Sequence, residues 1–323
     1  MSLDHSHSDH VFYVGEDDSE FFRSLHGRRF NNLNHTYCLP ADQDEVKRSE
    51  LHQRMMQFVF SGRNYIGPVK EALQFGQHRR ILDLGTGAGL WAISMADEFP
   101  RAEVIGIDLA PLQPRNVPPN CTFELCDINQ IPIPYPDNYF DLIHARSMHT
   151  GITDYPKMIR EIARLLRPGG LVLLIEPSLH PFSEGAEFPT PSSLSPSSSN
   201  SHWSSFWETY RNCLNRQGID VSVPEKLADF LLASGKFEAI VQRDGNIPVG
   251  FWPQDPILLT VGQLQWMDFD LFLPAVRPLF LSLGLGERHV DNLIANAHED
   301  LYHPPVDGLG CRIYIVHASK EIA

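Results

Sequence analysis

The sequence ILDLGTGAGLW, at residues 81–91, decides the fold. Apolar residues run into a turn with glycine at positions 85, 87 and 89, and a helical stretch at 90–99 follows. Glycines let the backbone turn sharply and let a ligand approach the main chain. A strand, a glycine-rich turn and a helix in this order predict a ligand site where the strand ends.

The glycine spacing and one acid beside it indicate the kind of ligand. A dinucleotide-binding turn has the pattern G-x-G-x-x-G, whereas this chain has G-x-G-x-G with Asp83 two residues before the first glycine. Dinucleotide sites hold a pyrophosphate at the helix N-terminus, whereas S-adenosylmethionine (SAM) carries a sulfonium and an ammonium group. A carboxylate at the strand end suits those positive charges. The turn therefore favours SAM and disfavours an NAD-dependent oxidoreductase.

Two further acids stand at the ends of the next two expected strands. Asp108 lies 19 residues after Gly89, and an acid at the tip of the second strand can accept hydrogen bonds from both ribose hydroxyls. Asp127 ends the third strand, where it can accept the adenine amino group. Either acid alone could be a helix cap, but three acids at successive strand tips beside the glycine turn indicate a cofactor pocket. Thr86, inside the turn, is expected near the amino-acid end of the cofactor.

Short apolar runs alternate with helical stretches, which predicts a parallel sheet with helices on both faces. The expected strands are residues 80–84, 103–107, 122–125, 140–144 and 171–175, and helices at 90–99 and 155–166 lie between them. Arg167-Pro168-Gly169-Gly170 is a helix stop directly before a strand. Helices at 203–217 and 224–234, a strand at 237–242, two helical pieces within 257–300 and a last strand at 311–317 follow. Since the tail returns to the sheet, we expect one domain with inserted elements.

A flexible segment at 1–30 and a single domain at 31–323, made of four parts, are expected. Residues 1–30 are expected to be a flexible N-terminal segment, and 31–78 a cap whose helix, at 45–60, has apolar residues on one face. Residues 79–182 would form the cofactor-binding core. Residues 183–205 are rich in serine and proline and predict a flexible loop, and 206–323 would supply the late strands with a helical substrate lid. The aromatic residues that recur at helical spacing from 203 to 210 would pack in the core or roof an apolar pocket.

The composition argues against several classes of function. The 323 residues contain 26 Lys and Arg against 40 Asp and Glu, a formal net charge of −14. An acidic chain without a basic run is a poor nucleic-acid binder, and no stretch approaches the roughly 18 consecutive apolar residues that a membrane helix needs. Five cysteines, an odd number without a CxxC motif, favour neither a disulfide framework nor a metal site. The polar N-terminus does not resemble a secretory signal, so we expect a cytoplasmic protein, with the nucleus as the alternative.

The segment at about 80–177 resembles a class I SAM-dependent methyltransferase, and a longer stretch is similar to the fungal LaeA-like methyltransferase family. The motifs that carry the likeness are YCLPADQDEVKR at 37–48, VIGIDLAPLQP at 104–114, VPPNC at 117–121, and His144-x-Arg146 with Asp154 after it. The likeness covers most of 37–182 and is looser after the serine-rich stretch. It implies a Rossmann-like α/β fold with a mostly parallel seven-stranded sheet, an N-terminal helical cap and a helical insert before the last strand.

The resemblance also implies that the helix of the cap covers the cofactor, with Tyr37 and Arg48 near it. Together with the strand-tip acids, it predicts a cofactor site made of Tyr37, Asp83, Gly85, Thr86, Gly87, Gly89, Asp108, Leu109, Asp127, Ile128 and His144. His144 stands in an apolar strand, where a lone histidine hydrogen-bonded to neighbouring backbone is the alternative, and Arg146 would pair with a family carboxylate. No metal is expected.

His149 is the first candidate for a catalytic base. The regulators of the family tend to have Gly-Gly where this chain has His149-Thr150, just after the fourth strand. Methyl transfer to a hydroxyl requires removal of its proton, and histidine has a suitable pKa near neutral pH. An exposed loop histidine is the alternative reading of His149. His180, after the fifth strand, is the second candidate.

The sequence therefore predicts a SAM-dependent methyltransferase. It would act on a hydroxyl, or secondly an amine, of a small aromatic or polyketide-like secondary metabolite. The alternative is a LaeA-like regulator that binds SAM and acts through protein partners in the control of secondary metabolism. A catalytically inactive binding module would keep the glycine turn but lack a usable pocket. The expected partner is a small molecule, with no nucleic acid and no membrane, and the oligomeric state is left open.

Overall fold

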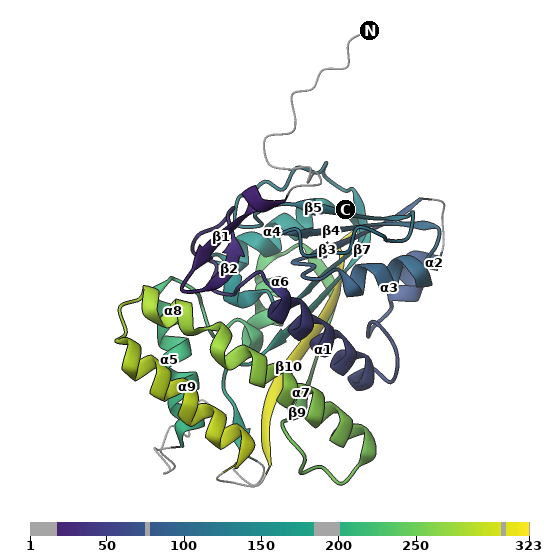
Figure 1. Ribbon diagram of the computed structural model, residues 1–323. Helices are drawn as coiled ribbons and strands as arrows, with labels where there is room; N and C mark the ends of the chain where they lie inside the picture. Colours follow the sequence, from purple (N-terminus) through teal and green to yellow (C-terminus); the bar gives the residue numbers. More distant parts are fainter. Residues whose placement is uncertain (1–17, 75–77, 184–200, 305–307, 323) are drawn as a thin grey trace.

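The computed structural model describes residues 18–74, 78–183, 201–304 and 308–322, which form an α/β fold around one large sheet (Figure 1). Parallel strands β3 (Arg79–Leu84), β4 (Ala102–Asp108), β5 (Cys121–Leu125), β6 (Phe140–Arg146) and β7 (Leu166–Pro177) are arranged in the order β5-β4-β3-β6-β7. β10 (Leu309–Lys320) is antiparallel to β7, and β9 (Phe237–Pro248) pairs with β10. Two-residue β8 (Phe182–Ser183) pairs with the start of β10. The sheet is thus seven strands wide, with β8 as a short extension, and the expected fold class is confirmed.

Apolar residues on both faces of the strands explain why this sheet is buried in the middle of the molecule. Along β3, Ile81 belongs to one core cluster and Leu82 to the other, and the same alternation occurs at Leu173 and Leu174 of β7. Continuous apolar runs of this kind are typical of parallel strands covered on both faces. The sequence pattern therefore leads directly to a three-layered arrangement.

Different helices cover the two faces. On one face, α4 (Tyr155–Leu165) and α6 (Leu227–Ser234) contribute buried side chains to the same cluster as Leu82. On the other, α1 (Gln43–Val59), α2 (Val69–Gln74) and α3 (Leu90–Glu98) share a cluster with Ile81. The turn between β3 and α3 lies at the carboxyl ends of the parallel strands, where ligands bind in open α/β sheets.

The insert before the last strand is helical and packs against the N-terminal cap. It contains α5 (His202–Arg216), α7 (Pro256–Ala275), α8 (Arg277–Ser282) and α9 (Glu287–Tyr302), so the region from 257 to 300 has three helical pieces rather than the two expected. α7 lies beside α1 (Figure 1). Trp207 of α5 stacks on Phe272 of α7 with ring centroids 5.6 Å apart. The aromatic residues of α5, Trp203, Phe206, Trp207 and Tyr210, are all buried, so they form core.

The N-terminal segment is more ordered than expected. Within residues 1–30, predicted to be flexible, β1 (Phe22–Leu25) pairs with β2 (Arg28–Asn31) in a hairpin, while 1–17 lie outside the described residues. The turn is His26-Gly27, both at positive φ, and such two-residue turns match the twist of a hairpin. Phe30 is only 1% exposed. The hairpin is therefore part of the fold.

Two further boundaries differ from the sequence expectation. Of the serine-rich stretch, 184–200 lie outside the described residues, and α5 already begins at His202, so the expected loop end at 205 is too late. β7 begins at Leu166 immediately after α4 and includes the Arg-Pro-Gly-Gly stop. Leu166 pairs with Phe140 of β6, and a register shift follows before Leu171. The glycines therefore lie in an irregular start of the strand.

Candidate functional site

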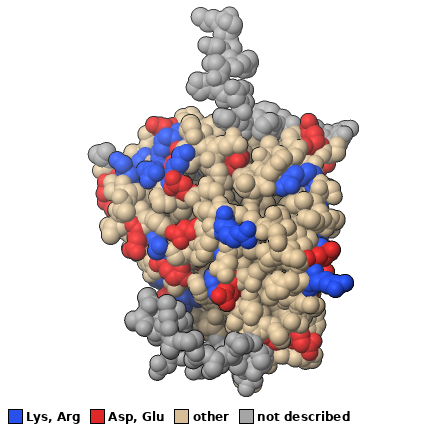
Figure 2. Space-filling model, turned by 90° about the vertical axis from the view of Figure 1, so that its left-hand side faces the viewer, with Lys and Arg blue, Asp and Glu red and all other residues tan. Residues whose placement is uncertain are grey.

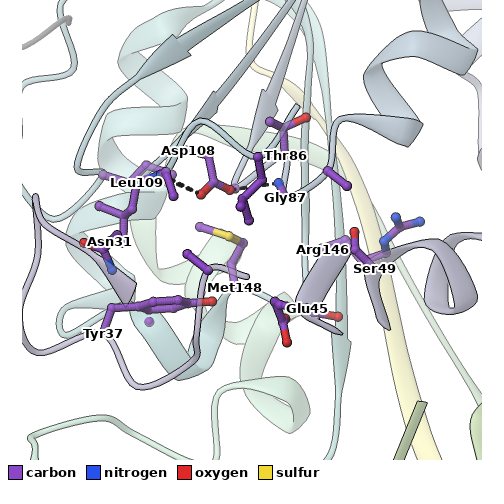
Figure 3. A pocket seen from close by; sticks show the side chains of 18 of the residues that line it. Asn31, Tyr37, Glu45, Ser49, Thr86, Gly87, Asp108, Leu109, Arg146 and Met148 are labelled. Atoms are coloured by element: carbon purple, nitrogen blue, oxygen red, sulfur yellow. Dashed lines mark hydrogen bonds between the residues drawn. The ribbon is translucent and has the colours of Figure 1, made fainter. Parts of the chain in front are cut away.

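A pocket lies at the carboxyl ends of β3, β4, β5 and β6, under α1 and the segment that precedes it (Figure 3). Its lining combines the glycine turn, the strand-tip acids and the cap. The lining includes Asn31, Tyr37, Glu45, Arg48, Ser49, His52, Asp83, Gly85, Thr86, Gly87, Asp108, Leu109, Asp127, Ile128, Asn129, His144, Arg146, Ser147, Met148 and Gly151. Ten of the eleven predicted cofactor residues are among them, with Gly89 as the exception.

The glycine turn brings bare backbone to the pocket wall. Gly85 and Gly87 have φ of 66° and 56°, a conformation that other residues rarely adopt. A Cβ at Gly85 would collide with Sδ of Met148, and one at Gly87 would lie 3.2 Å from Oγ of Ser49. Gly89 is instead the N-cap of α3, where a Cβ would collide with the ring of Phe123. A glycine is therefore needed at position 89 because the Phe123 ring packs against it.

Asp83 is the centre of a buried polar cluster beneath the turn. One carboxylate oxygen lies 2.7 Å from Nδ1 of His144, and the other accepts a hydrogen bond of 2.7 Å from the Thr86 hydroxyl. The His144 ring stacks on Trp91 at a centroid distance of 3.8 Å. Burial lowers the pKa of His144, although the carboxylate opposes this shift. His144 is thus held by a carboxylate, where sequence reasoning considered a backbone partner.

Asp108 joins the end of β4 to the glycine turn. Its Oδ2 accepts a hydrogen bond of 2.8 Å from the Gly87 backbone N–H, and its Oδ1 accepts one of 2.8 Å from that of Leu109 (Figure 3). Burial raises the pKa of this carboxyl to about 6, while the backbone donors oppose the rise. The acid is therefore held rigidly, with its charge facing the pocket.

Asp127, at the end of β5, is held by amide groups from two segments. Asn34, just after the N-terminal hairpin, donates from Nδ2 at 3.3 Å, and the Asn129 backbone N–H donates at 3.0 Å. The Asn129 side chain donates in turn to the Gly151 carbonyl at 2.8 Å. These bonds fix the wall that contains Ile128 and connect it to the cap.

The cap contributes a cluster of charges from α1. Arg48 pairs with Glu45 on the same helix and donates to Asp268 of α7 at 3.0 Å. The same carboxylate lies 3.2 Å from Nδ1 of His52. Tyr37 and Arg48 both line the pocket, as does His52, which sequence reasoning missed. Its signal was the spacing of four residues from Arg48, which puts both on one helix face.

The structure corrects the two predicted catalytic residues, neither of which lines the pocket. His149 is 1% exposed, and its Nδ1 lies 2.9 Å from the fully buried carboxylate of Glu176 on β7. His149 begins a short 3-10 turn, His149–Gly151, that follows β6. His180 follows β7 at the exposed surface. Neither ring is therefore placed to take a proton from a ligand in this pocket.

Arg146 also has a partner other than the one expected. The guanidinium donates to Oε1 of Gln53 on α1 at 2.7 Å, and burial lowers its pKa to about 10. This bond joins the end of β6 to the cap instead of pairing with a carboxylate.

The described parts of the chain contain no group of three or more His, Cys, Asp or Glu side chains that could hold a metal ion. None of the helices in those parts is long and apolar enough to cross a membrane. On the face shown in Figure 2, acidic and basic side chains are interspersed among uncharged ones.

Comparisons with known proteins find relatives of this chain by sequence and by structure. The family described as "Methyltransferase domain" matches residues 81–170. The secondary metabolism regulator laeA of Coprinopsis cinerea is 35% identical over 87% of this chain and 69% of that protein. Methyltransferase pytC of Aspergillus terreus is 29% identical over 76% of this chain and 71% of its own length. Among solved structures, phosphoethanolamine N-methyltransferase 2 of Haemonchus contortus is 18% identical with a TM-score of 0.48, covering 91% of this chain and 62% of its own.

Proposed function

Since this chain belongs to the LaeA-like family of SAM-dependent methyltransferases, we propose that it methylates a hydroxyl of a small aromatic or polyketide-like molecule, with an amine as the second acceptor. The observation that carries the proposal is a pocket at the strand ends that combines bare glycine backbone, three strand-tip acids and a helical cap. Small-molecule sites are concave and contain a few well-placed polar groups.

The charged groups that line the pocket fit SAM. When bound, SAM supplies a methyl group on a positively charged sulfur. Glu45, Asp83, Asp108 and Asp127 line the wall as carboxyl groups. Against these four stand two cations: Arg48, which is already paired with Glu45 and Asp268, and Arg146, which donates to Gln53. The surplus of acid favours a ligand with sulfonium and ammonium charges over a pyrophosphate.

We assign parts of the cofactor to these residues. Asp108 would accept the ribose hydroxyls, and Asp127 would accept the adenine amino group beside Ile128. The backbone of Gly85 and Gly87 would contact the amino-acid end, next to Thr86. Tyr37 would close the site from the cap, since it packs against Gly151.

The protein would orient the acceptor and keep water out of the site. α1 covers the glycine turn, because Ser49 lies against Gly87. An acceptor held between α1 and the end of β6 would face the methyl group in a fixed orientation. Positioning of this kind accounts for much of the rate enhancement in bimolecular transfers.

A regulatory role is the second candidate, because one relative is named as a regulator of secondary metabolism. In that case SAM would bind in the same pocket, and the protein would act through a partner protein. The two candidates differ in whether the purified chain turns over small acceptors.

Calorimetric titration with SAM, S-adenosylhomocysteine and NAD is the first test. We expect binding of both adenosyl compounds and none of NAD. A panel of phenols and amines with methyl-labelled SAM then tests the acceptor, and we expect label on phenols. Binding of SAM without transfer to any acceptor would favour the regulatory role, and absence of adenosyl binding would contradict both.

A further inference from the structure

We propose that His52, oriented by Asp268, is the general base that takes the proton from the acceptor hydroxyl. This inference rests on the proposed function. It also moves the base from the loop after β6, where sequence reasoning placed it, to the helix that faces that loop.

The two ring nitrogens of His52 face different partners. Nδ1 lies 3.2 Å from Oδ2 of Asp268, and Nε2 lies 3.4 Å from Oγ of Ser147. His52 and Ser147 both line the pocket, while Asp268 stands behind the ring and is 3% exposed. An Nδ1–H that donates to Asp268 leaves the Nε2 lone pair toward Ser147 and the pocket. A base oriented by a third group is the arrangement that activates hydroxyl acceptors.

The ring stands close to where the methyl group is expected. Ser49, one turn earlier on the same side of α1, lies against the glycine turn. Ser147 directly follows Arg146, the last residue of β6. His52 is therefore between the glycine turn and the end of β6, whereas His149, two residues beyond Ser147, turns away from the pocket.

The surrounding charges favour a neutral imidazole and an ionised orienting acid. Burial lowers the pKa of His52; Asp268 of α7 opposes this, and Arg146 of β6 and Arg48 of α1 add to it. Arg48 in turn lowers the pKa of Asp268 against the effect of burial. At neutral pH the ring is thus free to accept a proton.

The proposed transfer is a displacement at the methyl carbon in which His52 takes up the acceptor proton. An oxygen lone pair of the acceptor forms a bond to the methyl carbon, and the carbon–sulfur electron pair returns to sulfur. The hydroxyl proton moves to Nε2 of His52. The products are a methyl ether, neutral S-adenosylhomocysteine and an imidazolium, which releases one proton to solvent per turnover.

A structural link between α1 and α7 is the competing explanation, and the chain offers a matched control for it. Nε2 of His298 on α9 lies 3.2 Å from the backbone carbonyl oxygen of Asp270 on α7 and 3.5 Å from its Oδ1, which is a second histidine–aspartate contact between helices. Neither residue lines the pocket. His298→Gln should therefore leave transfer unchanged.

The test compares two acceptors with the 323-residue chain. We expect His52→Gln to lower kcat by about 10²–10⁴-fold on an unsubstituted phenol, with SAM affinity within about threefold of the unaltered protein. On a nitrophenol that is already ionised at neutral pH, the loss should fall below about tenfold, because no proton has to be removed. The variant's rate on the unsubstituted phenol should rise with pH. Asp268→Asn should show the same dependence on the acceptor.

Equal losses on both phenols would make His52 structural, and no loss on either would exclude it as the base. If the unaltered protein methylates only amines or nothing, the proposed hydroxyl chemistry fails, and the base with it. A measurement without acceptor complements this: ¹⁵N spectra of labelled histidine should assign His52 as neutral with the proton on Nδ1 at pH 7. A proton on Nε2 would overturn the orientation even if phenols are methylated.

Discussion

The ionisation of the Asp108 carboxyl is coupled to cofactor binding. Its pKa is raised to about 6 by burial, and its ionised form is the better acceptor for ribose hydroxyls. As the pH falls through 6, the carboxyl gains a proton that SAM binding must displace, so affinity should fall by up to about tenfold per pH unit. Titration calorimetry between pH 5 and pH 8 measures this slope.

The matched variant is Asp108→Ala, which should weaken SAM binding at pH 8 by about ten- to a hundredfold, the effect of losing hydrogen bonds to a charged group. Its affinity should no longer change around pH 6. A slope that persists in this variant would assign the titration to another group.

Glu176 supports the loop after β6 from below. The carboxylate is fully buried and accepts from the Met148 backbone N–H, the His149 ring and the Tyr155 hydroxyl. Glu176→Ala would leave these donors buried without an acceptor, and we expect a loss of about 3–5 kcal/mol in the free energy of unfolding. Urea denaturation measures it, and Glu208→Ala, on the exposed side of α5, is the control. A loss below 1 kcal/mol would show that water replaces the carboxylate.

At the scale of elements, one acid holds both the N-terminal hairpin and α1. Asp42 caps α1 by accepting from the Glu45 backbone N–H at 3.3 Å, and it accepts from Nε of Arg28 on β2 at 2.6 Å. Asp42→Ala should lower the free energy of unfolding by about 1–2 kcal/mol through the lost cap. It should also weaken SAM binding, since Asn31 and α1 both line the pocket.

The neighbouring acid is the control for that element. Asp44 is 65% exposed, and its carboxylate lies 3.9 Å from Arg28. Asp44→Ala should change neither stability nor SAM affinity measurably, because exposed ion pairs contribute little. If both variants weaken binding equally, the effect comes from net charge rather than from the cap.

The elements also explain which parts of the structure the sequence could predict. The glycine turn directly follows β3, Asp108 is the last residue of β4 and Asp127 lies two residues after β5, so local pattern could place all of them at strand ends. The hairpin at 22–31 was missed because its strands have only four residues each. The burial of His149 was missed because its partner, Glu176 of β7, lies 27 residues further along the chain. Local pattern gives the position of a residue along the chain but not such a distant partner.

At the scale of the whole molecule, the site depends on contacts that no local pattern contains. Asp268 is 220 residues from Arg48 and 216 from His52, yet it holds both. The link exists because β10 returns the chain to the sheet and the insert before it folds back over the cap. Sequence reasoning predicted a lid of helices but could not name the side chains that join it to α1. The pocket is therefore lined by residues between 31 and 152, while its cap is held in place by α7 of the later insert.

This link predicts that SAM binding reduces local opening of α7, although the cofactor pocket is lined by α1 and not by Asp268. Ordering α1 over bound SAM should hold Arg48 and His52 in place and thereby reduce local opening of the α7 turn around Asp268. We expect SAM to slow hydrogen exchange in both helices by at least about threefold, with little change in α6 on the opposite face of the sheet. In Asp268→Asn the slowing should persist in α1 and disappear from α7. Slowing confined to α1 in the unaltered protein would mean that the cap and the insert respond independently.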